Sequence, residues 1–179
     1  ENWIYPGTLR PQGRPIMTNS DTALTISGNQ KRKMKSASRL YAMQALFQME
    51  SSGQTSETIC DEFLDHRFGD DYEGDLLLVG DVDLFKNIIN KAVNLQAPID
   101  QLTDQALVEK WPLGRLDPAL RALFRAAGAE LLSDEAPPKV VISEYMEVAS
   151  AFYPDGKEAK FVNAILDHMA RSTKPEAFP

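Results

Sequence analysis

Apolar residues recur at three- and four-residue spacing from about residue 36 onward, and they almost never alternate by two. This spacing is typical of an amphipathic α-helix, whose buried face returns about every 3.6 residues. The first apolar stripe contains Leu40, Met43, Leu46 and Phe47, and it stops where two serines and a glycine follow at 51–53. The pattern therefore predicts helices rather than strands.

Helix-start signals divide the rest of the chain into six further helices. Asp117 followed by Pro118 is the clearest, because the carboxylate accepts a backbone N–H and proline fits the first helical position, which needs no donor. Ser56 is the expected N-cap of the second helix, and Asp81 or Asp83 that of the third. The other helices are expected to begin at Pro98, after Pro137 and Pro138, and before Phe161. We predict an all-α fold, a compact bundle of about seven helices in two small subdomains that divide near residues 68–80.

The N-terminal residues lack this pattern. Residues 1–16 contain three prolines and two glycines and precede Met17, so we expect an expression leader or the product of a misplaced start codon. Residues 18–30 are polar and predict a mobile tail. The expected organisation is a leader and disordered tail at 1–30, a single helical domain at 31–172 and a C-terminal tail at 173–179.

Positive charge is concentrated just before the first apolar stripe. Residues 31–39 read KRKMKSASR, with five basic side chains and no acidic one, in a chain of 179 residues whose formal net charge is −7. Residues 1–50 carry seven Lys/Arg against three Asp/Glu, whereas the remainder carries twelve against twenty-three. A basic arm on an acidic chain indicates a localised anion site, and nucleic-acid phosphates are the anion it suits best. A solvated, disordered arm is the more common explanation of such a run taken alone.

Sequence motifs for catalysis, metal binding and membrane insertion are absent. There is no GxGxxG, GxxxxGK[ST], GxSxG or HExxH pattern, and His66 and His168 are too few for a histidine-rich metal site. The single cysteine, Cys60, excludes an internal disulfide, and no apolar run approaches the roughly 20 residues that span a bilayer. We expect a cytoplasmic protein without enzymatic activity, cofactor, metal site or membrane association.

Three stretches, in order, resemble the NusB family of transcription antitermination factors. They are SASRLYAMQALFQME at 36–50, RLDPALRALFRAAGAELL at 115–132 and, most specifically, KFVNAILD at 160–167. The resemblance covers about residues 31–172. It implies a two-part all-helical fold that binds the boxA element of ribosomal RNA transcripts in single-stranded form. The partners it implies are the ribosomal protein NusE and the RNA polymerase antitermination complex, and it implies no catalysis.

The resemblance also carries candidate RNA-binding residues onto this chain. Cations of the arm are expected on phosphates, and aromatic rings on bases. The candidates are Lys31, Arg32, Lys33, Lys35, Arg39, Gln44, Phe47, Lys160 and Phe161. Phe47 equally fits the apolar core stripe, and Phe161 equally fits an anchor for the last helix. Lysines replace many of the family's arginines in the arm, which keeps phosphate attraction but loses bidentate geometry.

Two other functions agree with the sequence. A helical protein-interaction adaptor would use the acidic remainder of the chain to bind a basic partner, the arm being incidental. An accessory domain of the kind found in RNA methyltransferases would also be helical and would have no catalysis of its own.

Overall fold

The computed structural model describes residues 27–68, 71–72, 75–76, 80–107 and 113–179. Side chains are described for these residues except 71, 72, 75, 76 and 113. The expected leader at 1–16 and most of the expected tail therefore lie outside the described residues.

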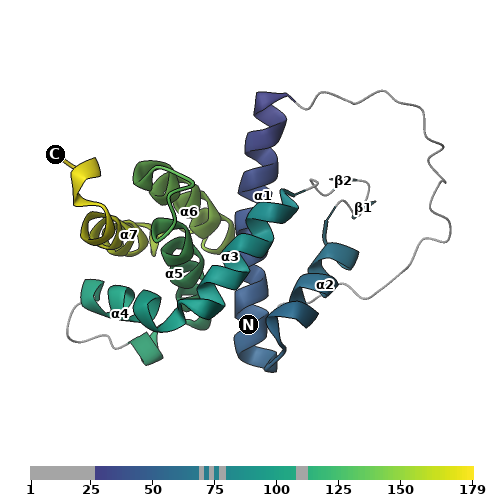
Figure 1. Ribbon diagram of the computed structural model, residues 1–179, viewed down its shortest axis with the longest axis horizontal. Coiled ribbons are helices and arrows are strands. Elements are labelled where there is room, and N and C mark those ends of the chain that lie inside the picture. The colour runs from purple at the N-terminus through teal and green to yellow at the C-terminus, as the bar shows by residue number, and fades with distance from the viewer. Residues whose placement is uncertain (1–26, 69–70, 73–74, 77–79, 108–112) are drawn as a thin grey trace.

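The described part of the chain contains seven α-helices, so the predicted all-α class and helix number are confirmed (Figure 1). The helices are α1 Gly28–Ser52, α2 Ser56–His66, α3 Val82–Asn94, α4 Gln96–Ala106, α5 Pro118–Leu131, α6 Pro138–Phe152 and α7 Ala159–Thr173. Two short 3₁₀ helices, η1 Leu113–Arg115 and η2 Pro175–Ala177, accompany them. The antiparallel strands β1 Asp71–Tyr72 and β2 Asp75–Leu76 were not predicted, but two residues each do not change the class.

Most helix ends follow the local signals in the sequence. Asp81 and Asp117 cap α3 and α5, each accepting a backbone N–H of the next turn at 3.0 and 2.9 Å. Gly53 ends α1 in the left-handed conformation with φ of 71°, which glycine adopts without steric cost. Two predicted starts are slightly wrong: Thr55 rather than Ser56 caps α2, and α4 begins two residues before Pro98.

Helix α1 begins earlier than the apolar pattern indicated. The Ser27 hydroxyl accepts the N–H of Gln30 at 3.2 Å, and the Gln30 side chain accepts the N–H of Ser27 at 3.0 Å. This reciprocal capping box satisfies two backbone donors and starts a helix at Gly28. Residues 28–30, expected in the tail, are therefore helical, and the whole basic run lies on α1.

The C-terminal residues 173–179 also differ from the expected tail. Helix α7 continues to Thr173, and η2 returns the chain so that Phe178 packs against the core. Lys174 Nζ donates to the carbonyl of Ser133 at 2.6 Å and pairs with Asp134 at 3.0 Å. These contacts hold the segment against the end of α5. Because the partners lie about forty residues earlier in the chain, the sequence of 173–179 alone does not predict this arrangement.

Helix α5 is the central element of the bundle and contacts α1, α3, α4, α6 and α7. Its small side chains, many of them alanines, allow this close approach, and the helix is buried almost throughout Ala119–Leu131. One hydrophobic core includes residues from all seven helices, so the α2–α3 side and the α4–α7 side share it. Figure 1 shows that the N-terminal half of α1 projects beyond the bundle that its C-terminal half helps to form.

Gly128 marks the closest approach between α5 and α4. A Cβ atom at this position would lie 2.5 Å from Cγ2 of Ile99, a buried side chain of α4. We expect Gly128→Ala to lower the free energy of unfolding by about 1–3 kcal/mol, because the clash forces the two helices apart. Urea denaturation followed by circular dichroism measures this loss. Gly114→Ala is the control, since its Cβ would meet no atom within 4 Å; equal stabilities of the two variants would contradict the expected clash.

Candidate nucleic-acid interface

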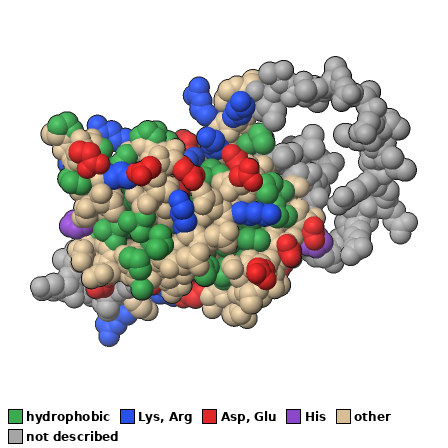
Figure 2. Space-filling model, in the orientation of Figure 1, with side chains coloured by type: hydrophobic (Ala, Val, Ile, Leu, Met, Phe, Trp, Pro, Cys, Tyr) green, Lys and Arg blue, Asp and Glu red, His purple; other side chains and the backbone are tan. Residues whose placement is uncertain are grey.

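Four cations are exposed on the projecting half of α1. Lys31, Arg32, Lys33 and Lys35 all lie in the first two turns and are solvent-exposed. Figure 2 shows Lys and Arg side chains gathered at this free end of the helix. No acidic residue occurs in α1 before Glu50, and the positive end of the helix dipole lies at the same terminus. We call residues 28–35 the basic arm; its charge and its exposure suit a polyanion.

A partly exposed stripe continues from the basic arm along one face of α1. Lys33, Ala37, Leu40, Gln44 and Phe47 recur at helical spacing, and none of them is buried. The stripe brings three of the candidate RNA-binding residues onto one face. Phe47 nevertheless packs in part against the core, so its ring has both an apolar contact and a solvent-facing side.

Arg39 does not belong to this exposed surface. It is 4% exposed, and its guanidinium makes a bidentate contact with Glu130 of α5, with Nε–Oε2 of 2.8 Å and Nη2–Oε1 of 3.0 Å. A third nitrogen, Nη1, lies 3.4 Å from the Glu144 carboxylate of α6. The prediction that Arg39 contacts RNA phosphates thus conflicts with its position, because its donors are already directed into the protein.

Electrostatics keep the buried Arg39 guanidinium charged. Burial by itself would lower the pKa of Arg39, but hydrogen bonding to and the charge of Glu130 outweigh it and raise the pKa above its ordinary value. Tyr145, fully buried beside the pair, has its pKa raised well above the ordinary value by burial and by the negative charge of Glu130. The phenol is therefore neutral and adds no charge to the cluster.

The opposite side of α1 is held by the chain that leads into α3. The Ser38 hydroxyl donates to the carbonyl of Asp81 at 2.7 Å, and the Asp81 N–H donates to the carbonyl of Met34 at 3.3 Å. Gly80 is required here, because a Cβ would lie 2.8 Å from Ser38 Oγ and 2.4 Å from a ring carbon of Phe68. These contacts fix α1 directly below the basic arm.

The two candidates on the last helix have different surroundings. Lys160 is exposed, whereas Phe161 is half-buried and meets Phe124 of α5 edge to face with ring centroids 6.3 Å apart. Helix α7 itself packs on α4, α5 and α6. The geometry of Phe161 suits the anchoring role that the sequence left open.

Removal of the Phe161 ring is expected to affect stability more than ligand binding. We expect Phe161→Ala to lower the free energy of unfolding by about 2 kcal/mol, less than the full cost of a completely buried phenylalanine because part of the side chain is already in contact with water. Urea denaturation and RNA binding, measured on the same preparation, separate the two effects. Lys160→Gln serves as the exposed neighbour control for stability. A loss of affinity without a loss of stability would instead assign the ring to base stacking.

A second ion network, not predicted from the sequence, occupies the other end of α1. Arg125 holds Asp100 of α4 with two contacts of 2.9 Å and reaches Glu50 at 3.2 Å. Arg121 donates to the same Glu50 carboxylate, and this hydrogen bond is the main reason that the pKa of Glu50 is lowered. Because both arginines neutralise carboxylates, this end of α1 lacks the excess charge of the basic arm.

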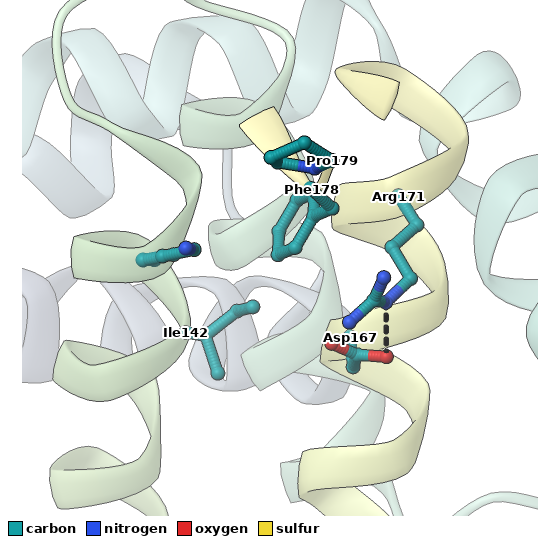
Figure 3. A pocket seen from close by; sticks show the side chains of 6 residues that line it. Ile142, Asp167, Arg171, Phe178 and Pro179 are labelled. Carbon is teal, nitrogen blue, oxygen red and sulfur yellow. Dashed lines mark hydrogen bonds and ion pairs between the residues drawn. The ribbon is translucent and has the colours of Figure 1, made fainter. Parts of the chain in front are cut away.

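A shallow hollow of about 400 Å³ lies between α6, α7 and the C-terminal segment (Figure 3). Phe178 lies in it with the Arg171 guanidinium 4.6 Å and the Lys139 ammonium 5.8 Å from the ring centroid. Arg171 also pairs with Asp167 at 2.8 Å, the contact drawn in Figure 3. The cations of this hollow thus have partners within the chain, whereas among the described residues no ion pair is found for Lys31, Arg32, Lys33 or Lys35.

Among the described residues, no group of three or more His, Cys, Asp or Glu side chains is placed to hold a metal ion. Over the same residues, no helix has the length and apolar character needed to cross a bilayer.

Comparison with known proteins identifies relatives over most of the chain. The NusB family profile matches residues 36–171. The transcription antitermination protein NusB of Maricaulis maris is 42% identical over 147 residues, which cover 82% of this chain and 91% of the relative.

Solved structures of such relatives share the fold. A structure of T. maritima NusB superposes with a TM-score of 0.65 at 32% identity, covering 80% of this chain and 95% of that one. A complex of the antitermination factors NusB and NusE with double-stranded RNA gives a TM-score of 0.62 at 21% identity, over 76% of this chain and 96% of the matched chain. At this lower identity the second likeness concerns the fold alone.

Proposed function

This chain belongs to the NusB family, and on that premise we propose that it is a transcription antitermination factor that binds boxA-type single-stranded RNA of ribosomal RNA transcripts. The observation that carries the proposal is the exposed basic arm on a chain that is otherwise acidic. A chain with a net charge of −7 has no general attraction for polyanions, so a concentrated cluster of cations on it is best explained by a local RNA site.

The surface of α1 suits a single strand. Proteins bind single-stranded nucleic acid with cations along its backbone and aromatic rings or apolar surface against its bases. On α1 the cations lie in the basic arm, and the stripe that starts at Lys33 extends to the partly exposed ring of Phe47. We propose that phosphates bind along the basic arm and that bases meet the stripe, with Gln44 as its hydrogen-bonding side chain.

The proposed partner is the ribosomal protein NusE, and the proposed setting is the RNA polymerase antitermination complex. Membership of the NusB family motivates this partner, and a NusB of the same fold has been solved together with NusE and double-stranded RNA. We propose that the protein acts in the cytoplasm, where transcripts are made, and that it acts by binding without catalysis.

The direct test is binding of a short boxA RNA to the whole chain, with and without NusE, at several salt concentrations. We expect preference over a scrambled RNA of equal length, tighter binding when NusE is present, and affinity that falls steeply with salt because phosphate neutralisation releases counterions. Equal affinity for boxA and scrambled RNA in both settings would overturn the proposed function. Binding to NusE alone, with no RNA binding in either setting, would favour the adaptor alternative.

A further inference from the structure

Arg39 lies on α1 one turn after the basic arm, at the level where the arm leaves the bundle, and its partners lie on other helices. The guanidinium is clamped bidentately by Glu130 of α5 and reaches Glu144 of α6 at 3.4 Å. The Ser36 hydroxyl donates to the same Glu144 carboxylate at 2.7 Å. One side of α1 is thus tied by charge-assisted hydrogen bonds to two other helices.

The α3 side ties α1 at the same level through Ser38. Its hydroxyl donates to the Asp81 carbonyl at 2.7 Å. Because successive helical residues are rotated by about 100°, Ser36 and Ser38 point about 160° apart around α1. Contacts on nearly opposite sides of one turn restrain rotation of α1 about its axis, and the hydrogen bond from the Asp81 N–H to the Met34 carbonyl, one turn earlier, restrains its tilt.

Rotation of α1 matters because the cations are distributed around the basic arm. Lys31 and Lys35 share one direction, Arg32 lies about 100° away from Lys31, and Lys33 lies about 200° away. A single RNA strand meets only part of this circumference at one time. The rotation of α1 therefore decides which cations, together with the stripe that begins at Lys33, face the strand.

We propose that Arg39, held by Glu130 and Glu144, is a positioning residue for RNA binding: it sets the rotation and direction of α1 relative to α5 and α6, and with them the direction in which the basic arm and the stripe face. Arginine suits this role because its planar guanidinium donates to two carboxylates in fixed directions, whereas lysine provides a single charge without a preferred plane. Glu130 is 4% exposed and does not touch a ligand on the surface. An effect of Glu130 on RNA binding is therefore indirect, and Arg39 is the side chain that connects Glu130 to α1.

The experiment compares Glu130→Gln with Glu147→Gln, which makes the same chemical change at an exposed position of α6. Spin labels at Lys31→Cys and Val140→Cys, in a chain whose buried Cys60 is replaced by alanine, report the distance between the basic arm and α6 without RNA. RNA affinity and its salt slope are measured on Glu130→Gln and Glu147→Gln proteins that keep Lys31, Val140 and Cys60. Circular dichroism and urea denaturation select conditions in which each variant is folded.

We expect a narrow distance distribution in the parent and in Glu147→Gln, and a broadened or shifted one in Glu130→Gln. The RNA affinity of Glu130→Gln should fall roughly three- to tenfold, because binding must then order the arm. Its salt slope should not change, because no phosphate contact is removed. Arg39→Lys should give a distance distribution of intermediate width, because lysine keeps the positive charge but lacks the bidentate geometry of the guanidinium.

Two results would overturn the proposal. One is a folded Glu130→Gln protein with the parental distance distribution and affinity. The other is an Arg39→Gln protein whose salt slope falls by about 0.7, which would make Arg39 a phosphate ligand. The RNA readout rests on the function proposed above, whereas the distance readout does not. If the parent fails to bind boxA RNA but Glu130→Gln still broadens the distances, the proposed function fails and the role of Arg39 in directing α1 stands.

Discussion

Replacing Lys31, Arg32, Lys33 and Lys35 together by glutamine is expected to abolish most RNA affinity at physiological salt. If each cation neutralises one phosphate, the salt slope falls by roughly 3, at about 0.7 for each contact with a single strand. If the variant and the parent bind equally at 1 M salt, this difference in slope makes the variant about two orders of magnitude weaker at 0.15 M salt. Helicity should be unchanged, because all four side chains are exposed and glutamine is a good helix former.

The control for this variant removes four exposed cations elsewhere in the chain. Lys86, Arg115, Lys139 and Lys157 are solvent-exposed and lie outside the basic arm. Their replacement by glutamine changes the net charge by the same amount. It should alter RNA affinity only slightly, because exposed charges more than about 8–10 Å from the strand are screened. Similar losses in the two variants would mean that net charge, rather than the basic arm, governs binding.

Arg39→Met is expected to cause the largest loss of stability among the charged residues, about 3–5 kcal/mol, because it leaves the Glu130 carboxylate buried without its bidentate partner. Glu144, with 22% of its side chain exposed, retains some access to water and contributes less to this cost. The measurement is urea denaturation at neutral pH. Adding Glu130→Gln to Arg39→Met should recover most of the loss, because the double variant buries no unpaired charge.

Arg171→Met is the comparison for an exposed ion pair. Its guanidinium pairs with Asp167 one turn away, with the two side chains 54% and 41% exposed. Such an ion pair contributes less than about 1 kcal/mol and the exposed contact with the Phe178 ring about the same, so this variant should lose far less stability than Arg39→Met. If Arg39→Met and its double variant with Glu130→Gln lost equal stability, an unpaired charge would not explain the effect, and lost packing around the arginine stem would.

Local chemistry in the sequence was sufficient to predict the helices and most of their ends. The spacing of apolar residues depends only on the helical repeat, and the caps at Asp81 and Asp117 involve groups within three residues of each other. The start of α1 at Gly28 was also encoded locally, in the capping box formed by Ser27 and Gln30. The prediction missed it because the apolar stripe begins later than the helix does.

The candidate site was predicted only in part. The charge of the basic arm is a property of the sequence, and the structure places its four cations in solvent. The sequence around Phe161 is compatible with anchoring α7 and with facing a ligand. The contact of its ring with Phe124 favours the first role. The ordered segment 173–179 likewise depends on Ser133 and Asp134, about forty residues earlier.

Arg39 shows most clearly where local information ends. It lies in the same basic run as Lys31–Lys35 and has the same charge, so composition and spacing place it with the RNA-binding cations. Its carboxylate partner is 91 residues away on α5, and a second lies on α6. Helical periodicity and capping depend on residues only a few positions apart, so they can be predicted from the sequence. Whether a cation faces water or a buried carboxylate depends on which helices pack together, and only the folded bundle separates Arg39 from the four cations of the basic arm.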